Sequence, residues 1–243
     1  MLFDPKTWAP GMEAPDALAL QQTLAEIERQ DREEFTRQRA ERHNALRASS
    51  CIPRCYANAT PADWTIDRSA SSAIQKAQEA ALKLATRAVA GWAEWRRRGD
   101  WILMMGPEGT GKTLLASILA NGLIQLGVPV RYIAAASASD AVRYTYGADA
   151  KTSERALMAG WLGADVLIVD ELGAQTATAH DLKITWSILN GRYEAKQPTV
   201  LITNFSLDAL EKPLGPNMIG RIIERTRDSL CLDMVWDSWR RKK

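Results

Sequence analysis

Short apolar runs alternate with longer segments of helical periodicity from residue 101 onward. These runs have the length and the branched residues that are typical of buried strands. They lie at residues 101–105, 130–135, 165–170 and 199–203, with a further candidate at 230–236. Helical segments are expected at residues 112–126, 138–162, 179–196 and 207–228. Because strands that alternate with helices form parallel sheets covered on both faces, the pattern predicts an α/β fold.

The N-terminal segment follows a different pattern. After an irregular lead-in rich in proline, Asp16 is expected to cap a helix that continues to about Arg47. Its apolar stripe is narrow and lies among alternating acidic and basic side chains, so this helix cannot build a core alone. The stripe consists of Leu20, Leu24, Ile27 and Phe35. Two interpretations are open: packing on its own chain, or docking on a partner or a second copy. We favour docking, because the helix lies outside the α/β segment.

The stretch at residues 48–72 is rich in Ser, Pro, Asn and Ala, and is interpreted as a linker that lies over the next domain. A strong helix pattern then covers Ser72 to Trp95 and ends at Gly99. We therefore predict three parts. They are a helical arm at residues 1–50, a linker at 51–70 and the α/β domain at 71–243.

The composition is that of a globular protein. Of the 243 residues, 46% are hydrophobic and 25% charged, and the formal net charge is only +2, so a nucleic-acid partner would have to meet local basic patches. No secretory signal is evident, and no apolar run approaches the ~20 residues that span a bilayer. Three cysteines do not suggest a disulfide framework, and Cys51 and Cys55 lack nearby ligands to complete a zinc site. We expect a reduced, cytoplasmic protein without a membrane partner.

Residues 106–113, GPEGTGKT, match the phosphate-binding pattern G-x-x-x-x-G-K-[ST], placed between a strand and a helix. The glycines let backbone N–H groups point at phosphates, and the helix N-terminus adds its positive dipole end. Lys112 would reach the β- and γ-phosphates, and Thr113 would offer its hydroxyl to Mg²⁺. The sequence thus predicts a site for ATP and Mg²⁺. Its nucleotide-binding residues are Gly106, Pro107, Glu108, Gly109, Thr110, Gly111, Lys112, Thr113 and Leu114.

Two adjacent carboxylates, Asp170 and Glu171, follow the buried strand VLIV. A parallel sheet would bring them to the edge that carries the phosphate loop. Asp170 is suited to hold the Mg²⁺ shell together with Thr113. Glu171 is suited to polarise an attacking water as a general base. The pair predicts hydrolysis of ATP rather than transfer of phosphate to a small molecule.

Further polar residues follow the next strand and the last long helix. Asn204 ends the TVLIT strand, where its amide would lie near the γ-phosphate and the attacking water. Arg221 and Arg225 are one helical turn apart and share a face. They are either a basic face paired with nearby carboxylates, or arginine fingers offered to the ATP of a neighbouring subunit.

The phosphate loop, VLIVDELG, the TN strand end, GRIIERTR and the closing VWDSWR together resemble the AAA+ helicase loaders of the DnaC type and the related IstB helper ATPases. The resemblance covers residues 50–243. It implies an AAA+ sheet with no C-terminal lid, and Arg225 as the principal finger with Arg221 as its accessory. It also implies self-association through the ATPase interfaces.

The same resemblance implies that single-stranded DNA passes a helical segment that here holds Arg143, Tyr144 and Tyr146. A cation beside aromatic rings suits single strands, because bases stack on the rings and phosphates meet the charge. Ordinary helix packing is the alternative for the tyrosines. The helical arm matches in kind the region with which such loaders grip a replicative helicase of the DnaB type.

These features predict an ATPase that loads a ring helicase onto single-stranded DNA during replication initiation. One alternative is an IstB-type transposition helper, which shares the ATPase core but serves a transposase. An alternative from another class is an adaptor that binds ATP without hydrolysing it. The intact Glu171 and Asn204 speak against the adaptor.

Overall fold

The computed structural model describes residues 17–147, 149–173, 178–227 and 230–239. The chain divides into two compact units, residues 1–42 and 43–243. The division falls within the first helix, α1 (Ala17–Ser50), so the last turns of α1 belong to the second unit. Asp16, the expected cap of this helix, lies outside the described residues. No helix in the described ranges is both long and apolar enough to cross a membrane.

The part of α1 within the first unit carries its own ion pairs. Arg29 contacts Glu26 and Glu33, each at 2.6 Å, one turn before and one turn after it. Such pairs support a helix that has little core of its own. Three apolar side chains of the predicted stripe, Leu24, Ile27 and Phe35, are exposed.

The second unit is built on a parallel five-stranded sheet in the order β2-β3-β4-β1-β5. The strands are β1 (Trp101–Met105), β2 (Val130–Ala134), β3 (Val166–Asp170), β4 (Thr199–Ile202) and β5 (Cys231–Asp233). Because all strands run the same way, the residues that follow β1, β3 and β4 meet at one edge of the sheet. The phosphate loop, the carboxylate pair and Asn204 are those residues.

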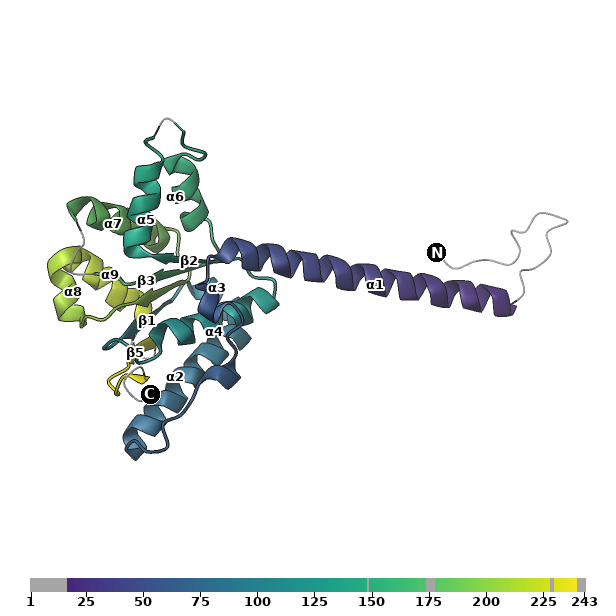
Figure 1. Ribbon diagram of the computed structural model, residues 1–243, viewed down its shortest axis with the longest axis horizontal. Coiled ribbons are helices and arrows are strands. Elements are labelled where there is room, and N and C mark those ends of the chain that lie inside the picture. Colours follow the sequence, from purple (N-terminus) through teal and green to yellow (C-terminus); the bar gives the residue numbers. More distant parts are fainter. Residues whose placement is uncertain (1–16, 148, 174–177, 228–229, 240–243) are drawn as a thin grey trace. The chain divides into compact units, whose positions relative to one another are not determined.

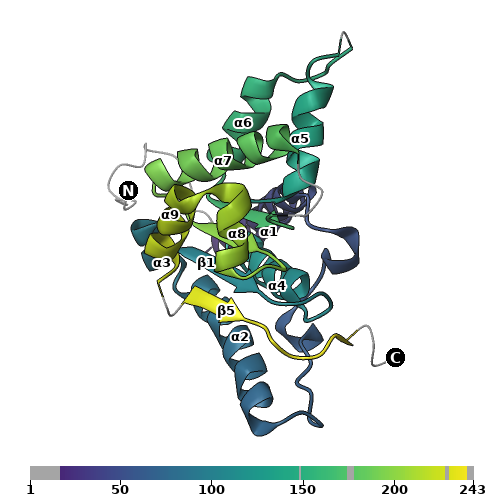
Figure 2. The ribbon, with the colours of Figure 1, turned by 90° about the vertical axis from the view of Figure 1, so that its left-hand side faces the viewer.

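Helices cover both faces of the sheet, as Figures 1 and 2 show. Ile102 and Met104 of β1 pack in the hydrophobic cluster that contains α2 (Ser72–Ala90), α3 (Trp92–Arg98) and α4 (Lys112–Gln125). Trp101 and Leu103 pack in the opposite cluster. That cluster contains α5 (Ala135–Tyr144), α6 (Glu154–Leu162), α7 (Ala179–Glu194), α8 (Leu207–Leu214) and α9 (Pro216–Thr226). Because successive side chains of a strand point to opposite faces, neighbouring residues of β1 pack against different helical layers.

Three of the predicted helices are each divided in two. The segment from Ser72 to Trp95 breaks at Gly91, which ends α2 and precedes α3. The segment predicted at 138–162 starts earlier, directly after β2, and forms α5 and α6. The segment predicted at 207–228 breaks at Gly215, whose φ of 80° lies in the left-handed region. The final strand is also shorter than predicted, because the chain turns away after Asp233 to cross the phosphate loop.

The stretch at residues 51–70 packs on the second unit. The side-chain amide of Asn121, in α4, donates to the backbone carbonyls of Tyr56 and Ala59 at 3.1 and 2.9 Å. Trp64 is buried, and its indole N–H donates to the carbonyl of Gln78 at 3.0 Å. This stretch therefore contributes side chains to the core beside α4.

A fully buried arginine joins α7 to the start of β4. The guanidinium of Arg192 donates to the carbonyls of Trp161, Leu162, Ala164 and Pro198 and to the hydroxyl of Thr199. Burial lowers the pKa of Arg192 to about 9. The carbonyl oxygens at the end of α6 and before β4 thus share one donor. Buried carbonyl groups need such a donor.

Candidate nucleotide site

The phosphate loop lies between β1 and α4 in the conformation that its glycines permit. Gly106 and Gly109 have φ values of 132° and 80°, which side chains rarely adopt. A Cβ on Gly106 would lie 2.5 Å from the carbonyl oxygen of Met234, and one on Gly109 would lie 1.9 Å from Oγ of Ser238. The Nζ of Lys112 donates to the carbonyls of Gly106 and Pro107 at 2.6 and 2.7 Å. The ammonium group is therefore held within the curl of the loop.

The predicted metal ligands meet beside the loop. Oγ1 of Thr113 donates to Oδ2 of Asp170 at 3.0 Å, and Asp170 is buried at the end of β3. A hydroxyl and a carboxylate at this distance are an oxygen pair that fits Mg²⁺, which binds few protein ligands and keeps phosphate oxygens and water in its shell. Thr113 and Asp170 would hold the ion.

Tyr132 is a polar partner of this pair that sequence reasoning missed. It is buried in β2, and its hydroxyl donates to Oδ2 of Asp170. Burial raises the pKa of Tyr132, and the negative charge of Asp170 raises it further, so the hydroxyl keeps its proton and remains a donor. The adjacent register of β2 and β3, which pairs Ala134 with Asp170, brings the two side chains together.

Glu171 has a backbone conformation that non-glycine residues rarely adopt, with φ at 56°. Its N–H donates to Oδ1 of Asp170 at 2.7 Å, and its side chain is exposed. Asn204 is also exposed, directly after Thr203, whose hydroxyl donates to the carbonyl of Leu172 at 2.8 Å. The ends of β3 and β4 are thereby fixed to each other, and both side chains line the same cavity as the phosphate loop.

That cavity has a volume of about 320 Å³. Nine of its lining residues come from the predicted site: Glu108, Gly109, Gly111, Lys112, Thr113, Leu114, Asp170, Glu171 and Asn204. Thr203, Tyr56 and Trp239 also line it. Gly106, Pro107 and Thr110 are not among the lining residues. The Thr110 hydroxyl donates to the Pro107 carbonyl at 3.0 Å, within the loop. The loop, both carboxylates and the amide therefore converge on one cavity.

Residues 234–239, here called the strap, cross the phosphate loop after β5 (Figure 2). The N–H of Met234 donates to the carbonyl of Met105 at 2.8 Å, and that of Trp239 to Gly109 at 2.9 Å. The indole N–H of Trp236 donates to the carbonyl of Thr110 at 2.9 Å. Trp236 also packs edge-on against Trp64, with ring centroids 6.4 Å apart. The strap thus makes two hydrogen bonds to the phosphate loop and one to the end of β1.

The two candidate finger arginines lie elsewhere, on α9, and neither lines the nucleotide cavity. Both guanidinium groups lie 4.8 Å from the ring centroid of Tyr193 in α7. Nη2 of Arg225 also donates to the Tyr193 carbonyl at 3.2 Å. We call Arg221 and Arg225 the arginine pair. Its two members share one aromatic platform.

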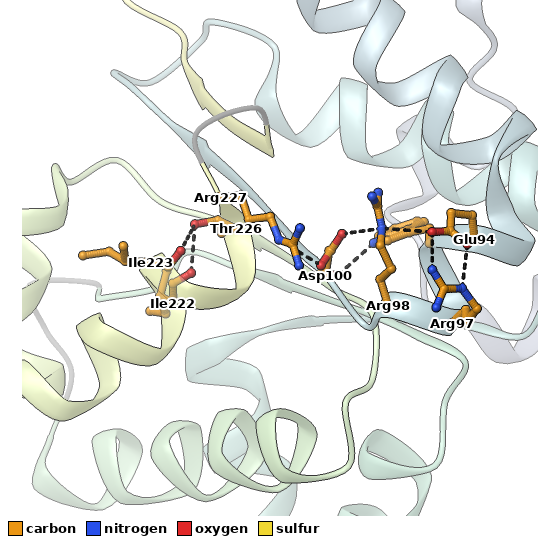
Figure 3. Close-up of polar contacts among 9 residues, drawn as sticks. Glu94, Arg97, Arg98, Asp100, Ile222, Ile223, Thr226 and Arg227 are labelled. Carbon is orange, nitrogen blue, oxygen red and sulfur yellow. Dashed lines mark hydrogen bonds and ion pairs between the residues drawn. The ribbon is translucent and has the colours of Figure 1, made fainter.

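The end of α9 is anchored to the start of β1 (Figure 3). The carboxylate of Asp100 is buried and forms ion pairs with Arg98 at 2.9 Å and with Arg227 at 3.6 Å. Arg227 follows α9 directly, and its φ of 46° is a strained value for a residue other than glycine. The same residue forms the ion pair with Asp100. The turn that carries Arg225 is therefore tied to the sheet.

The three candidate DNA contacts lie at the C-terminal end of α5 and just beyond it, away from the cavity-lining residues. Arg143 forms ion pairs with Asp140 at 2.7 Å and with Asp181 at 3.3 Å. Tyr144 and Tyr146 are 80% and 62% exposed, and the Tyr146 hydroxyl donates to Glu154 at 3.1 Å. The tyrosine rings are thus available at the surface, while the cation already has carboxylate partners.

A parallel sheet in this order, with a phosphate loop after β1 and an acidic pair after β3, defines a P-loop domain of the AAA+ type. The chain belongs to the family of IstB-like ATP binding proteins, whose model matches residues 22–243. The family resemblance and the fold inferred from the sequence are confirmed.

Several relatives and solved structures are similar to this chain. The replicative helicase loader DnaC of Escherichia coli is 33% identical over 138 residues, which are 57% of this chain and 55% of that protein. The chain thus spans about half the length of the curated relatives that it matches. A crystal structure of the DnaC helicase loader has a TM-score of 0.62 and 20% identity, and covers 74% of this chain and 99% of its own. A crystal structure of DnaI has a TM-score of 0.58 and 19% identity, and its match covers 79% of this chain and 98% of its own. These two structures show the likeness of fold.

Proposed function

We propose that this protein hydrolyses ATP in order to load a ring-shaped replicative helicase onto single-stranded DNA. The observation that carries the proposal is the convergence of Lys112, Thr113, Asp170, Glu171 and Asn204 on one cavity. The DnaC relatives are replicative helicase loaders, which supplies the biological context of the proposal.

Each side chain of the cavity has a role in this proposal. Lys112 and the loop N–H groups bind the phosphates of ATP, and Thr113 and Asp170 hold Mg²⁺. Bound Mg²⁺ supplies neutralisation of the negative charge on the phosphates. Glu171 accepts a proton from the attacking water, and Asn204 orients that water through its amide. The exposed position of both side chains at the cavity supports these roles.

Arg225, with Arg221 as accessory, completes the site of a neighbouring copy. Neither arginine lines the cavity of its own chain, which supports a role in trans. A guanidinium that meets the γ-phosphate of a neighbour stabilises the charge that develops during hydrolysis. ATP would then join the ATPase domains side by side, and hydrolysis would weaken the junction.

The remaining parts of the chain supply the partners in this proposal. Phe35, Leu24 and Ile27 offer an exposed apolar stripe on α1 for a DnaB-type helicase. Tyr144 and Tyr146 offer exposed rings on which the bases of single-stranded DNA stack. Arg143 would contribute a phosphate contact only by exchanging its carboxylate partners Asp140 and Asp181 for the nucleic acid.

A second candidate function is that of an IstB-type transposition helper, and the matching family model favours it. Such a protein would use the same ATPase core but would serve a transposase and prefer duplex DNA. The two candidates therefore differ in the form of DNA that stimulates hydrolysis.

The test measures phosphate release with no DNA, with single-stranded DNA and with a duplex of the same length, in the wild type and in Lys112→Ala. Stimulation by single strands that is lost in Lys112→Ala is the expected result. Capture of a purified DnaB-type helicase by the wild type, reduced by Phe35→Asp but not by the neighbouring Thr36→Asp, then tests the partner. Preferential stimulation by duplex DNA would favour the transposition helper. ATP binding without hydrolysis would favour an adaptor.

A further inference from the structure

Tyr193 occupies the centre of the α7–α9 contact. It is the last tyrosine of α7, and its half-buried ring faces Arg221 and Arg225 on α9. The two guanidinium groups lie at the same distance from its centroid, 4.8 Å. Cations within about 6 Å of an aromatic centroid are attracted by the ring quadrupole. One ring therefore holds both arginines against the electrostatic repulsion of their like charges.

Two hydrogen bonds fix the ring and one arginine relative to the helices. The Tyr193 hydroxyl donates to Oε2 of Glu224 at 2.6 Å, and the Tyr193 carbonyl accepts from Nη2 of Arg225 at 3.2 Å. Arg221 gains a weaker second contact, because its guanidinium lies 5.8 Å from the ring of Trp186. Tyr193 thus contacts α9 through its ring, its hydroxyl and its backbone.

Arg221 and Arg225 are each partly exposed, so the accessible part of each guanidinium could meet a phosphate on another molecule. Nη1 of Arg221 and Nε of Arg225 are buried and have no acceptor within the described part of the chain. Stacking on a ring uses the flat face of a guanidinium and leaves its N–H edge for an anion. Because these two N–H groups are buried, they cost stability, and a phosphate on another molecule would meet the accessible N–H groups of the pair instead.

The geometry points to Tyr193 as a positioning residue that presents Arg221 and Arg225 together to ATP bound by a neighbouring copy of this chain. This inference rests on the proposed function, in which the arginine pair acts in trans. Donors held in place before the reaction need not reorganise when charge develops, which is the main source of electrostatic catalysis. The anchoring of α9 through Arg227 and Asp100 would keep the platform and the pair in register with the sheet.

The test compares Tyr193→Leu with Tyr193→Phe and uses Lys112→Ala as a complementing partner. Tyr193→Leu removes the platform and is expected to lower ATP hydrolysis about tenfold, the effect of two cation–π contacts of usual strength. Tyr193→Phe keeps the ring and is expected to retain hydrolysis within about twofold, because only the hydroxyl contact with Glu224 is lost. Binding of a fluorescent ADP analogue should be unchanged in both variants, since Tyr193 does not line the cavity.

Mixing two variants shows whether Tyr193 acts on ATP bound by its own protomer or on ATP bound by a neighbour. A Lys112→Ala protomer cannot hydrolyse ATP but carries an intact arginine pair and Tyr193. Added in excess, it should restore hydrolysis by Tyr193→Leu protomers, as it should for Arg225→Ala protomers. A protomer that is merely misfolded would not be restored.

The outcomes separate the inference from the proposed function. Rescue of Arg225→Ala but not of Tyr193→Leu would overturn the role of Tyr193 and leave the arginine role intact. Unchanged hydrolysis in Tyr193→Leu would do the same. If Arg225→Ala is itself not rescued, action in trans fails, and the inference fails with it.

Discussion

In the nucleotide cavity, Lys112, Thr113 and Asp170 have hydrogen-bond partners within the chain. Lys112 donates to two loop carbonyls, and Asp170 accepts from Thr113 and Tyr132. On α9, in contrast, the arginine pair stacks on Tyr193 and keeps buried donors without an acceptor in the described ranges. The first region has the character of a site formed before its ligand arrives. The second lies outside that cavity, and under the proposed function its partly exposed guanidinium groups would meet a ligand on another molecule.

Arg192 lies one residue before Tyr193 in α7, so its contacts can be compared directly with those of the arginine pair. Its guanidinium reaches five acceptors and is wholly buried. The same helix therefore carries one arginine whose donors are satisfied within the fold and, one residue later, the platform for two arginines that each keep one donor without an acceptor in the described ranges. Arg192 therefore stabilises the fold, whereas the role of Arg221 and Arg225 in trans is part of the proposed function.

The largest expected effect concerns the cavity itself. Replacing Glu171 by Gln keeps the size of the side chain but removes the base, so hydrolysis should fall by a factor of about 10² to 10⁴. Binding of ATP should remain within a few-fold of the wild type, because the loop and Asp170 are untouched. Single-turnover hydrolysis and nucleotide titration measure the two quantities separately. Glu211→Gln, which changes an exposed carboxylate of α8 outside the cavity, is the control. Equal activity of Glu171→Gln and the control would remove Glu171 from the mechanism.

The second effect concerns Arg192, whose guanidinium is buried among backbone carbonyls. Arg192→Met leaves four buried carbonyls without their donor and should lower the free energy of unfolding by at least about 3 kcal/mol. Arg225→Ala should lower it by less than about 1 kcal/mol, since its contacts are one cation–π pair and one hydrogen bond. Chemical denaturation compares the two, with Arg192→Lys measured if the Met variant does not accumulate. Similar losses in Arg192→Met and Arg225→Ala would contradict the distinction between structural and functional arginines.

The smallest effect concerns a third arginine, Arg143, whose partner Asp181 begins α7. The neighbouring Ser139 hydroxyl and the Thr178 N–H hold the pKa of Asp181 at about 2, below its ordinary value of 3.8. Because the folded pKa is the lower one, this stabilisation is complete above about pH 4 and is lost as pH falls toward 2. Asp181→Asn should therefore destabilise the protein by about 1 kcal/mol at pH 6 but much less at pH 2.5. Unfolding titrations at several pH values measure the difference. A loss of unfolding free energy that does not change with pH would show that Asp181 acts through its shape and not through its charge.

The sequence was sufficient where a pattern is local. The bounds of β1 and the start of α4 at Lys112 match the prediction, because a buried strand, a glycine loop and a helix follow one another without interruption. The acidic pair at the end of β3 was placed for the same reason. Nine of the residues that line the cavity could thus be named from three short motifs, whereas Tyr56 and Trp239 could not.

The parts that the sequence did not reveal depend on contacts between distant segments. Nothing near Tyr132 indicates that its hydroxyl meets Asp170, because the contact is set by the register of β2 against β3. The platform role of Tyr193 likewise requires the packing of α7 against α9. The break at Gly215 was missed because the apolar spacing continues in the same period on both sides of it.

The strap has a consequence for the order in which the protein is made. Trp236 bonds to a carbonyl of the phosphate loop that lies 126 residues earlier in the chain. When the loop leaves the ribosome, Gly106 and Gly109 have none of the neighbours that the strap provides later. A nascent chain that has emerged only through β4 therefore contains the complete phosphate motif in a loop that lacks two of its hydrogen bonds, those from Trp236 and Trp239. We therefore expect the phosphate loop to reach its final conformation only after residues 234–239 have been made.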